Sequence, residues 1–175
     1  MRIIAGKARG TKLYTLEGMN TRPTLDRVKE SLFNIIQNEI PGSIFLDLFA
    51  GSGAIGLEAV SRGAKKTILC DKEKSAIQII KKNIEKTHFQ NETEIYNEAF
   101  EKLLTTKIHE NIDICYIDPP YKTNYVYDAI KIMLEENIVN EDTMIIIETD
   151  EKEREIENLK TTNLEIYDSR KYGRA

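Results

Sequence analysis

The chain has 175 residues, which suits one domain of ordinary size, and we expect residues 1–175 to form a single domain. Its residues are 41% hydrophobic, enough for one core, and no apolar run reaches the ~18 residues that a membrane span needs. The first residues lack the long apolar segment of a secretory signal. Cys70 and Cys115 each lie in an apolar run, which is typical of reduced core thiols. These features favour a cytoplasmic protein that has no membrane partner.

The net charge of −4 argues against a general nucleic-acid coat protein, but the charge is unevenly distributed. Residues 1–30 include seven basic and three acidic residues, whereas residues 141–160 include eight acidic and three basic ones. A basic end on an acidic body favours a local contact with phosphate over uniform coating.

The first twenty residues predict a small β-hairpin, and the candidate turn residues are Gly6, Gly10 and Gly18. A helix follows, and its apolar stripe consists of Val28, Leu32, Ile35 and Ile36. We treat residues 1–42 as an N-terminal extension of the one domain.

From residue 43 onward, apolar β-type runs alternate with helical patterns. The predicted strands span residues 44–49, 67–71, 94–96, 112–117, 144–148 and 164–172. The predicted helices span residues 54–62, 73–86 and 125–135, with another around Phe100. This order predicts an α/β fold, with an open and mostly parallel sheet that carries helices on both faces. Ligands bind such sheets beyond the carboxyl ends of the strands.

A glycine-rich loop follows the first core strand and opens a helix. Its glycines, Gly51, Gly53 and Gly56, match the dinucleotide-binding spacing, and Asp71 at the end of the next strand can accept ribose hydroxyls. NAD and S-adenosylmethionine share these two features. Asp47 distinguishes them, because a carboxylate beside the loop repels a pyrophosphate and attracts a cationic ligand. The loop therefore favours S-adenosylmethionine.

A second loop, Asp118-Pro119-Pro120-Tyr121, follows the strand predicted at residues 112–117. The exocyclic amine of a nucleic-acid base is a poor nucleophile, because its lone pair is delocalised into the ring. Asp118 and the carbonyl of Pro119 can accept its two N–H bonds, since proline has no N–H group to compete. Tyr121 offers a ring on which a flipped-out base can stack. The loop predicts methyl transfer to an amino nitrogen.

The target base is less strongly indicated. Guanine presents two adjacent N–H donors, which suit a carboxylate such as Asp118, whereas adenine presents an acceptor next to its amine. An adenine-N6 DNA or RNA methyltransferase is the alternative enzyme, although such enzymes usually need a larger target-recognition region. A non-catalytic RNA-binding module for ribosome assembly is the alternative outside enzymes.

The motifs together resemble the RsmD-type methyltransferases, which modify guanine N2 in bacterial small-subunit (16S) ribosomal RNA. The resemblance covers residues 1–10, 20–34, 47–53, 118–121 and 170–173. It implies a Rossmann-like class I methyltransferase sheet of seven strands and, as substrate, 16S ribosomal RNA in an assembling small subunit. The cofactor contacts that we expect are Asp47, Phe49, Gly51, Ser52, Gly53, Asp71, Glu98 and Ala99. The expected RNA contacts are Lys7, Arg9, Arg22, Arg27, Lys29, Arg170 and Lys171.

Two further expectations concern the end of the chain and metals. The resemblance implies one more strand after the Tyr-Gly turn at residues 172–173, so we expect the catalytic core, residues 43–175, to lack its final strand. His88 and His109 have no partners at metal-ligand spacing, and we expect no metal.

Overall fold

The computed structural model describes residues 1–16 and 23–172 and alternates strands with helices. The strands are β1 (Ile44–Asp47), β2 (Lys66–Cys70), β3 (Thr93–Tyr96), β4 (Ile114–Ile117) and β5 (Met144–Ile147). The helices are α1 (Pro23–Ile35), α2 (Ala54–Ser61), α3 (Lys74–Thr87), α4 (Phe100–Thr106), α5 (Tyr125–Glu135) and α6 (Lys152–Leu159). None of the helices in these ranges is long and apolar enough to cross a membrane.

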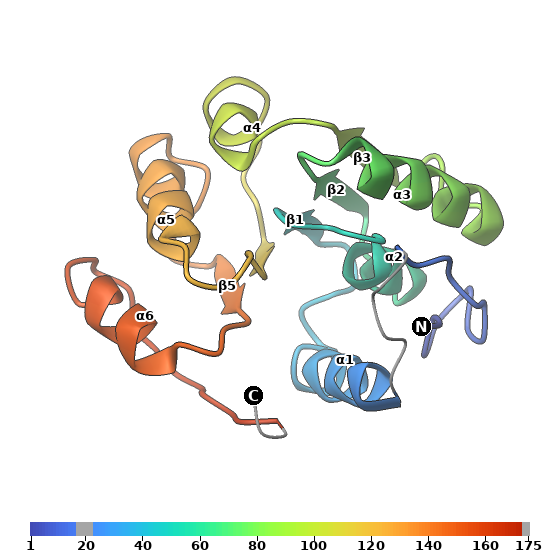
Figure 1. Ribbon diagram of the computed structural model, residues 1–175, viewed down its shortest axis with the longest axis horizontal. Coiled ribbons are helices and arrows are strands. Elements are labelled where there is room, and N and C mark those ends of the chain that lie inside the picture. The colour runs from blue at the N-terminus through green and yellow to red at the C-terminus, as the bar shows by residue number, and fades with distance from the viewer. Residues whose placement is uncertain (17–22, 173–175) are drawn as a thin grey trace.

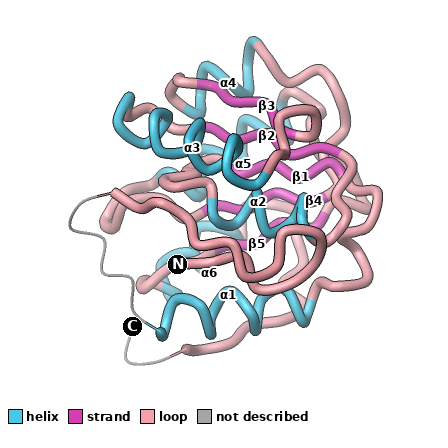
Figure 2. The backbone as a smooth tube through the Cα atoms, turned by 90° about the vertical axis from the view of Figure 1, so that its right-hand side faces the viewer, coloured by secondary structure: helices cyan, strands magenta, loops and turns pink. Residues whose placement is uncertain are grey.

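The strands form one parallel sheet in the order β3-β2-β1-β4-β5. Helices cover both of its faces, with α1, α2 and α3 on one face and α4, α5 and α6 on the other (Figure 1). Figure 2 shows the strands side by side in the middle of the molecule. This arrangement confirms the predicted α/β fold with a parallel sheet.

The pleat of β1 explains how a short strand supports two helical layers. Successive side chains of a strand point to opposite faces. Phe45 packs against Phe33 of α1, with ring centroids 6.4 Å apart, whereas Leu46 belongs to the cluster formed with α4 and α5. Because both faces are covered, the central strands are continuous apolar runs, and all four residues of β4 are buried.

Two expectations about the C-terminal part are wrong. Residues 164–172 form no strand, and the sheet has five strands in the described residues, whereas a seven-stranded sheet without its final strand would have six. β5 is therefore the edge of the sheet in these residues, and residues 164–172 do not pair with it. The acidic residues 141–160 include α6, whose Glu155 and Leu159 are buried one turn apart.

The N-terminal extension begins with the predicted hairpin. Ile3 donates its N–H to the carbonyl of Thr11 at 2.9 Å, and Arg2 and Lys12 form an antiparallel bridge. Gly6 at the turn has φ 81°, and a Cβ there would lie 1.7 Å from the carbonyl oxygen of Ser61, so only glycine fits. Gly18 and Arg22 lie outside the described residues.

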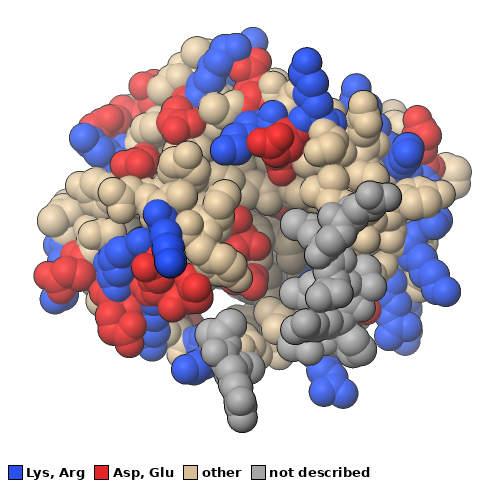
Figure 3. Space-filling view, viewed as in Figure 1, with Lys and Arg blue, Asp and Glu red and all other residues tan. Residues whose placement is uncertain are grey.

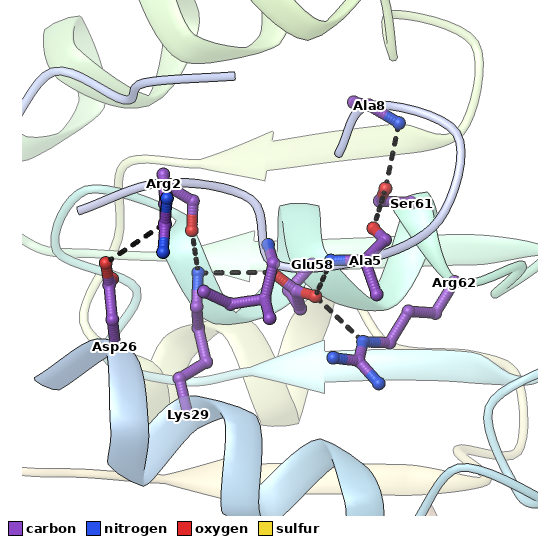
Figure 4. A network of polar contacts seen from close by, with 9 residues as sticks. Arg2, Ala5, Ala8, Asp26, Lys29, Glu58, Ser61 and Arg62 are labelled. Atoms are coloured by element: carbon purple, nitrogen blue, oxygen red, sulfur yellow. Dashed lines mark hydrogen bonds and ion pairs between the residues drawn. The ribbon is translucent and has the colours of Figure 1, made fainter. Parts of the chain in front are cut away.

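A buried carboxylate joins this extension to the sheet. Glu58 of α2 is 0% exposed and accepts the N–H groups of Ile4 at 2.7 Å and Ala5 at 3.0 Å (Figure 4). It also pairs with Lys29 Nζ at 3.2 Å and Arg62 Nε at 2.8 Å. One side chain therefore holds the hairpin and two helices together.

This network corrects the expected role of Lys29. Its side chain is 3% exposed and points inward, where it donates to the carbonyl of Arg2 at 2.6 Å (Figure 4). Burial lowers the pKa of Lys29, while Glu58 opposes that change by stabilising the ammonium. Lys29 is a structural ion-pair partner and does not present its charge to RNA.

Replacing Lys29 with methionine should therefore lower stability. Lys29→Met keeps the side-chain length but leaves Glu58 short of one partner, and we expect a loss of about 3 kcal/mol in the free energy of unfolding. Urea denaturation measures it. The double variant Lys29→Met/Glu58→Gln should recover part of the loss, because both charges are gone. Simple additivity of the two changes would contradict the buried pair.

Candidate active site

The carboxyl ends of β1 and β4 meet where the chain order of the sheet reverses. Asp47 ends β1 and lies opposite Tyr116 of β4, and Asp118 follows two residues later. Alternation puts Asp47, Tyr116 and Asp118 on the same face, the one covered by α1 and α2. The switch point of an open parallel sheet is where ligands bind. The structure thus brings together the two loops predicted from sequence.

The glycine loop bends back over the end of β1. Gly51 has φ 53° and Gly53 φ 76°, and a Cβ on Gly53 would lie 3.2 Å from Leu69. The N–H of Gly51 donates to the carboxylate of Asp71 at 2.9 Å. Asp71 therefore already orders this loop, and its two oxygens retain further acceptor capacity for hydroxyl groups.

Asp47 is an unusual carboxylate for a protein interior. It is 1% exposed, and its Oδ1 has no hydrogen-bond partner in the described residues. Burial raises its pKa to about 8, and the charges of Asp118 and Asp71 contribute, while the N–H groups of Phe49 and Gly56 oppose the rise. A cation beside it would restore the ionised form. Asp47 is therefore suited to holding a positively charged ligand.

Asp118 occupies a more open recess, and sequence reasoning missed its neighbour Glu148. The Asp118 side chain is accessible to solvent, yet the surrounding protein desolvates it and, together with the charge of Glu148, raises its pKa to about 7. Glu148 follows β5, and the hydroxyl of Tyr116 donates a hydrogen bond to it. Its position at the carboxyl end of the next strand was the available signal. Figure 3 shows acidic side chains in the depth of a central hollow.

The rest of the catalytic loop combines a stiff backbone with an open aromatic ring. Pro119 and Pro120 fix two successive φ angles near −65°, and Tyr121 is 69% exposed. Thr123 Oγ1 donates to the carbonyl of Pro120 at 2.9 Å and closes the turn. The loop therefore presents a flat apolar surface next to Asp118.

An aromatic cluster borders the site on the opposite face of the sheet. The ring of Phe49 stacks on Tyr125 at 6.0 Å and tilts against Phe100 at 5.3 Å. Glu98 and Ala99 immediately precede α4, and Glu98 pairs with Lys102 at 2.5 Å. Ser52 is 6% exposed. The contacts of these residues with a cofactor stay predictions.

The basic residues expected to bind RNA come from both ends of the described chain. Lys7, Arg9 and Arg27 are exposed on the hairpin and α1, whereas Arg170 and Lys171 are exposed near the other end of the described chain. A cavity of about 370 Å³ lies between the hairpin and α1. It is lined by Arg2, Ile3, Ile4, Arg9, Gly10, Asp26, Arg27 and Glu30.

Metal ligation has no support from the described part of the chain. There, no three residues among histidine, cysteine, aspartate and glutamate are grouped so that they could hold an ion. The pKa of Cys70 is raised to about 12, mainly by burial, and both cysteines are buried and free. Neither thiol is a nucleophile at neutral pH.

Comparisons with known proteins agree with this geometry. A family model described as "Conserved hypothetical protein 95" matches residues 1–175. Ribosomal RNA small subunit methyltransferase D of Haemophilus influenzae is 38% identical over 152 residues, covering 86% of this chain and 79% of that protein. The Escherichia coli (strain K12) protein of the same name is 33% identical over 150 residues, covering 86% and 75%. A solved structure of a proposed methylase from Haemophilus influenzae has TM-score 0.72 and 36% identity, covering 86% and 82%.

The parallel sheet, the glycine loop and the acidic loop at its switch point define a Rossmann-like methyltransferase. The chain belongs to the family of conserved hypothetical protein 95, the RsmD family that its sequence resembles.

The raised pKa of Asp47 predicts a pH-dependent stability. Between about pH 4 and pH 8 the unfolded chain has released this proton while the folded protein retains it, so stability falls as pH rises. Asp47→Asn cannot ionise at this position and still offers an acceptor to Phe49 and Gly56. As the pH rises from 5 to 8, the free energy of unfolding of this variant should increase by at least about 2 kcal/mol relative to that of the parent, measured by urea unfolding without ligand.

The exposed Asp142→Asn serves as the control and should follow the parent at both pH values. A parent and an Asp47→Asn variant with parallel pH profiles would show that Asp47 is ionised throughout this range.

Proposed function

We propose that the chain transfers a methyl group from S-adenosylmethionine to the exocyclic N2 of a guanine in 16S ribosomal RNA of an assembling small subunit. The observation that carries the proposal is the placement of Asp118 beside Asp47 and the glycine loop at one switch point. The names of two relatives, at 38% and 33% identity, support ribosomal RNA as the substrate.

The residues at the site fit this cofactor. The buried Oδ1 of Asp47 without a partner suits an ammonium group, and the left-handed Gly51 and Gly53 let a ligand approach the backbone closely. Asp71 has acceptor capacity for ribose hydroxyls. When bound, S-adenosylmethionine supplies an electrophilic methyl group on a sulfonium. No phosphate is needed, which agrees with three carboxylates around the loop.

Asp118 and Pro119 would prepare the nucleophile. An ionised Asp118 and the carbonyl of Pro119 accept the two N–H bonds of the base amine, which favours a pyramidal nitrogen with its lone pair directed outward. A pKa of about 7 also suits Asp118 to take the released proton near neutral pH. The exposed ring of Tyr121 holds the flipped base by stacking. Most of the rate gain would come from orientation.

The hairpin and α1 would bind the RNA backbone. Arg2 and Arg9 of the hairpin and Arg27 of α1 line one cavity, and guanidinium groups recognise phosphate with paired N–H donors. Asp26 and Glu30 in the same lining limit the net charge, so this contact would be local. Lys7, Arg170 and Lys171 are exposed and could contribute phosphate contacts as well.

The activity is tested by transfer of labelled methyl from S-adenosylmethionine to small subunits isolated from a strain that lacks this modification. We expect N2-methylguanosine on nucleoside analysis of the labelled RNA. N6-methyladenosine would instead identify the adenine enzyme, and cofactor binding without transfer to any RNA would indicate the non-catalytic assembly module.

The catalytic control for this assay is Asp118→Ala. Transfer should fall by at least about 1000-fold, while affinity for S-adenosylmethionine stays within about tenfold, the pattern of a group that acts in the transition state. Full activity of this variant would remove the proposed mechanism without affecting the cofactor assignment.

The RNA contact is tested by the salt dependence of binding. Arg9→Ala and Arg27→Ala should each weaken binding to an unmodified 16S fragment and reduce the slope of log K against log salt by about one. Lys131→Ala on α5 is the matched control on an exposed helix surface. Unchanged slopes in both arginine variants would place the RNA elsewhere.

A further inference from the structure

We propose that Arg154 of α6 is a positioning residue for the catalytic loop, an inference that rests on the proposed role of residues 118–121. Arg154 donates from Nη2 to the carbonyl of Thr123 at 2.6 Å. Thr123 in turn donates to the carbonyl of Pro120. Arg154 is thus connected through two hydrogen bonds to the segment that carries Asp118 and Tyr121.

Two carboxylates hold the guanidinium in place. Glu151, which immediately precedes α6, forms an ion pair with Nη1 at 2.5 Å, and Oε1 of Glu155 accepts a hydrogen bond from Nη2 at 2.6 Å. The side chain of Glu155 is 4% exposed, and its Oε2 has no hydrogen-bond partner in the described residues. A buried carboxylate with one paired oxygen is costly unless a cation stays beside it. Glu151 and Glu155 therefore fix the guanidinium on one side, while Nη2 also donates to the Thr123 carbonyl of the loop.

The loop needs such an external constraint. Lys122 lies between Tyr121 and Thr123 with φ 62°, a left-handed conformation that non-glycine residues rarely adopt. The prolines restrict only the first half of the loop, and Asn124 immediately precedes α5 without a side-chain cap. The hydrogen bond from Arg154 to Thr123 stabilises the second half, where the chain turns from Tyr121 into α5.

The space between α6 and the loop is too small for a ligand. It measures about 10 Å³ and is lined by residues 119–123 of the loop together with residues 148–151, 154 and 155. A volume of this size holds at most one water molecule. The contact between α6 and the loop therefore serves packing and alignment, and it is not a second binding site.

Arginine is the residue that this geometry requires. Its planar fork offers separate N–H groups to Glu151, Glu155 and the Thr123 carbonyl at once. A lysine has one compact ammonium and cannot reach three acceptors in the same arrangement. Arg154→Lys should therefore keep the charge of α6 while losing the alignment of the loop.

The position of the loop can be measured without any enzymatic assay, because the chain contains no tryptophan. Tyr121→Trp places a single tryptophan in the loop, and its emission is excited selectively over that of the remaining tyrosines. Adding Arg154→Ala to this variant should lower the steady-state anisotropy and increase acrylamide quenching of that tryptophan. Lys152→Ala, on the exposed side of the same helix, is the control and should leave both unchanged.

Kinetics complete the test in the chain that retains Tyr121. Arg154→Ala should lower kcat by about 10- to 100-fold, because misplacing a reacting group by about 1 Å costs that much. Affinity for S-adenosylmethionine should stay within about threefold. The kcat of Arg154→Lys, which preserves the charge, should lie between those of Arg154→Ala and the parent. Thermal melting checks that each variant is folded.

Equal anisotropy in the Arg154→Ala and Lys152→Ala forms of the tryptophan reporter would overturn the proposal, whatever the kinetics show. An unchanged kcat in Arg154→Ala would overturn it as well. If the parent chain transfers no methyl group to RNA, the proposed function fails, while the anisotropy result still decides whether Arg154 orders the loop.

Discussion

The buried carboxylate of Glu58 is the constraint on which the arrangement of this molecule depends. It lies on α2, the helix that the glycine loop opens, and it binds the backbone of the N-terminal hairpin as well as Lys29 of α1. Removing a carboxylate from water is unfavourable, and only its several partners together offset that cost. The hairpin, α1 and α2 are therefore coupled, so the arginines of the hairpin have a defined position relative to the sheet.

Strand alternation positions the residues of the candidate site as well as those of the core. The strand alternation that directs Phe45 toward α1 also directs Asp47 to the same side, and the neighbouring strands add Asp118 and Glu148. One face of the sheet thus carries apolar packing along the strands and carboxylates just where the strands end. The opposite face ends in the rings of Phe49, Phe100 and Tyr125. Charge and aromatic surface meet at the same edge because successive residues of a strand alternate in direction.

Local patterns in the sequence were sufficient for the glycine loop, for residues 118–121 and for most strands and helices, because these depend on spacing within short windows. Local patterns failed where a residue distant in the sequence determines the environment of a side chain. Lys29 has the same local pattern as a surface lysine, and only Glu58, on another helix, makes it a core residue. Glu148 heads an acidic stretch, and its role follows from the pairing of β5 with β4. The strand expected at residues 164–172 is absent from the described residues, because strand propensity does not determine whether a segment pairs with the edge of a sheet.

The crowding of Asp47, Asp71 and Asp118 has a consequence for the order of events at the site. Ionised carboxylates held close together repel one another, and binding of a cationic ligand offsets that repulsion. A methyl donor of the sulfonium type arrives with a positive charge at the reacting atom, and its spent form is a neutral thioether. Under the proposed function, these carboxylates would bind the sulfonium donor more tightly than the thioether by-product, because only the donor carries the additional positive charge on sulfur. The repulsion that raises the pKa of Asp47 would then favour both entry of the donor and release of the by-product.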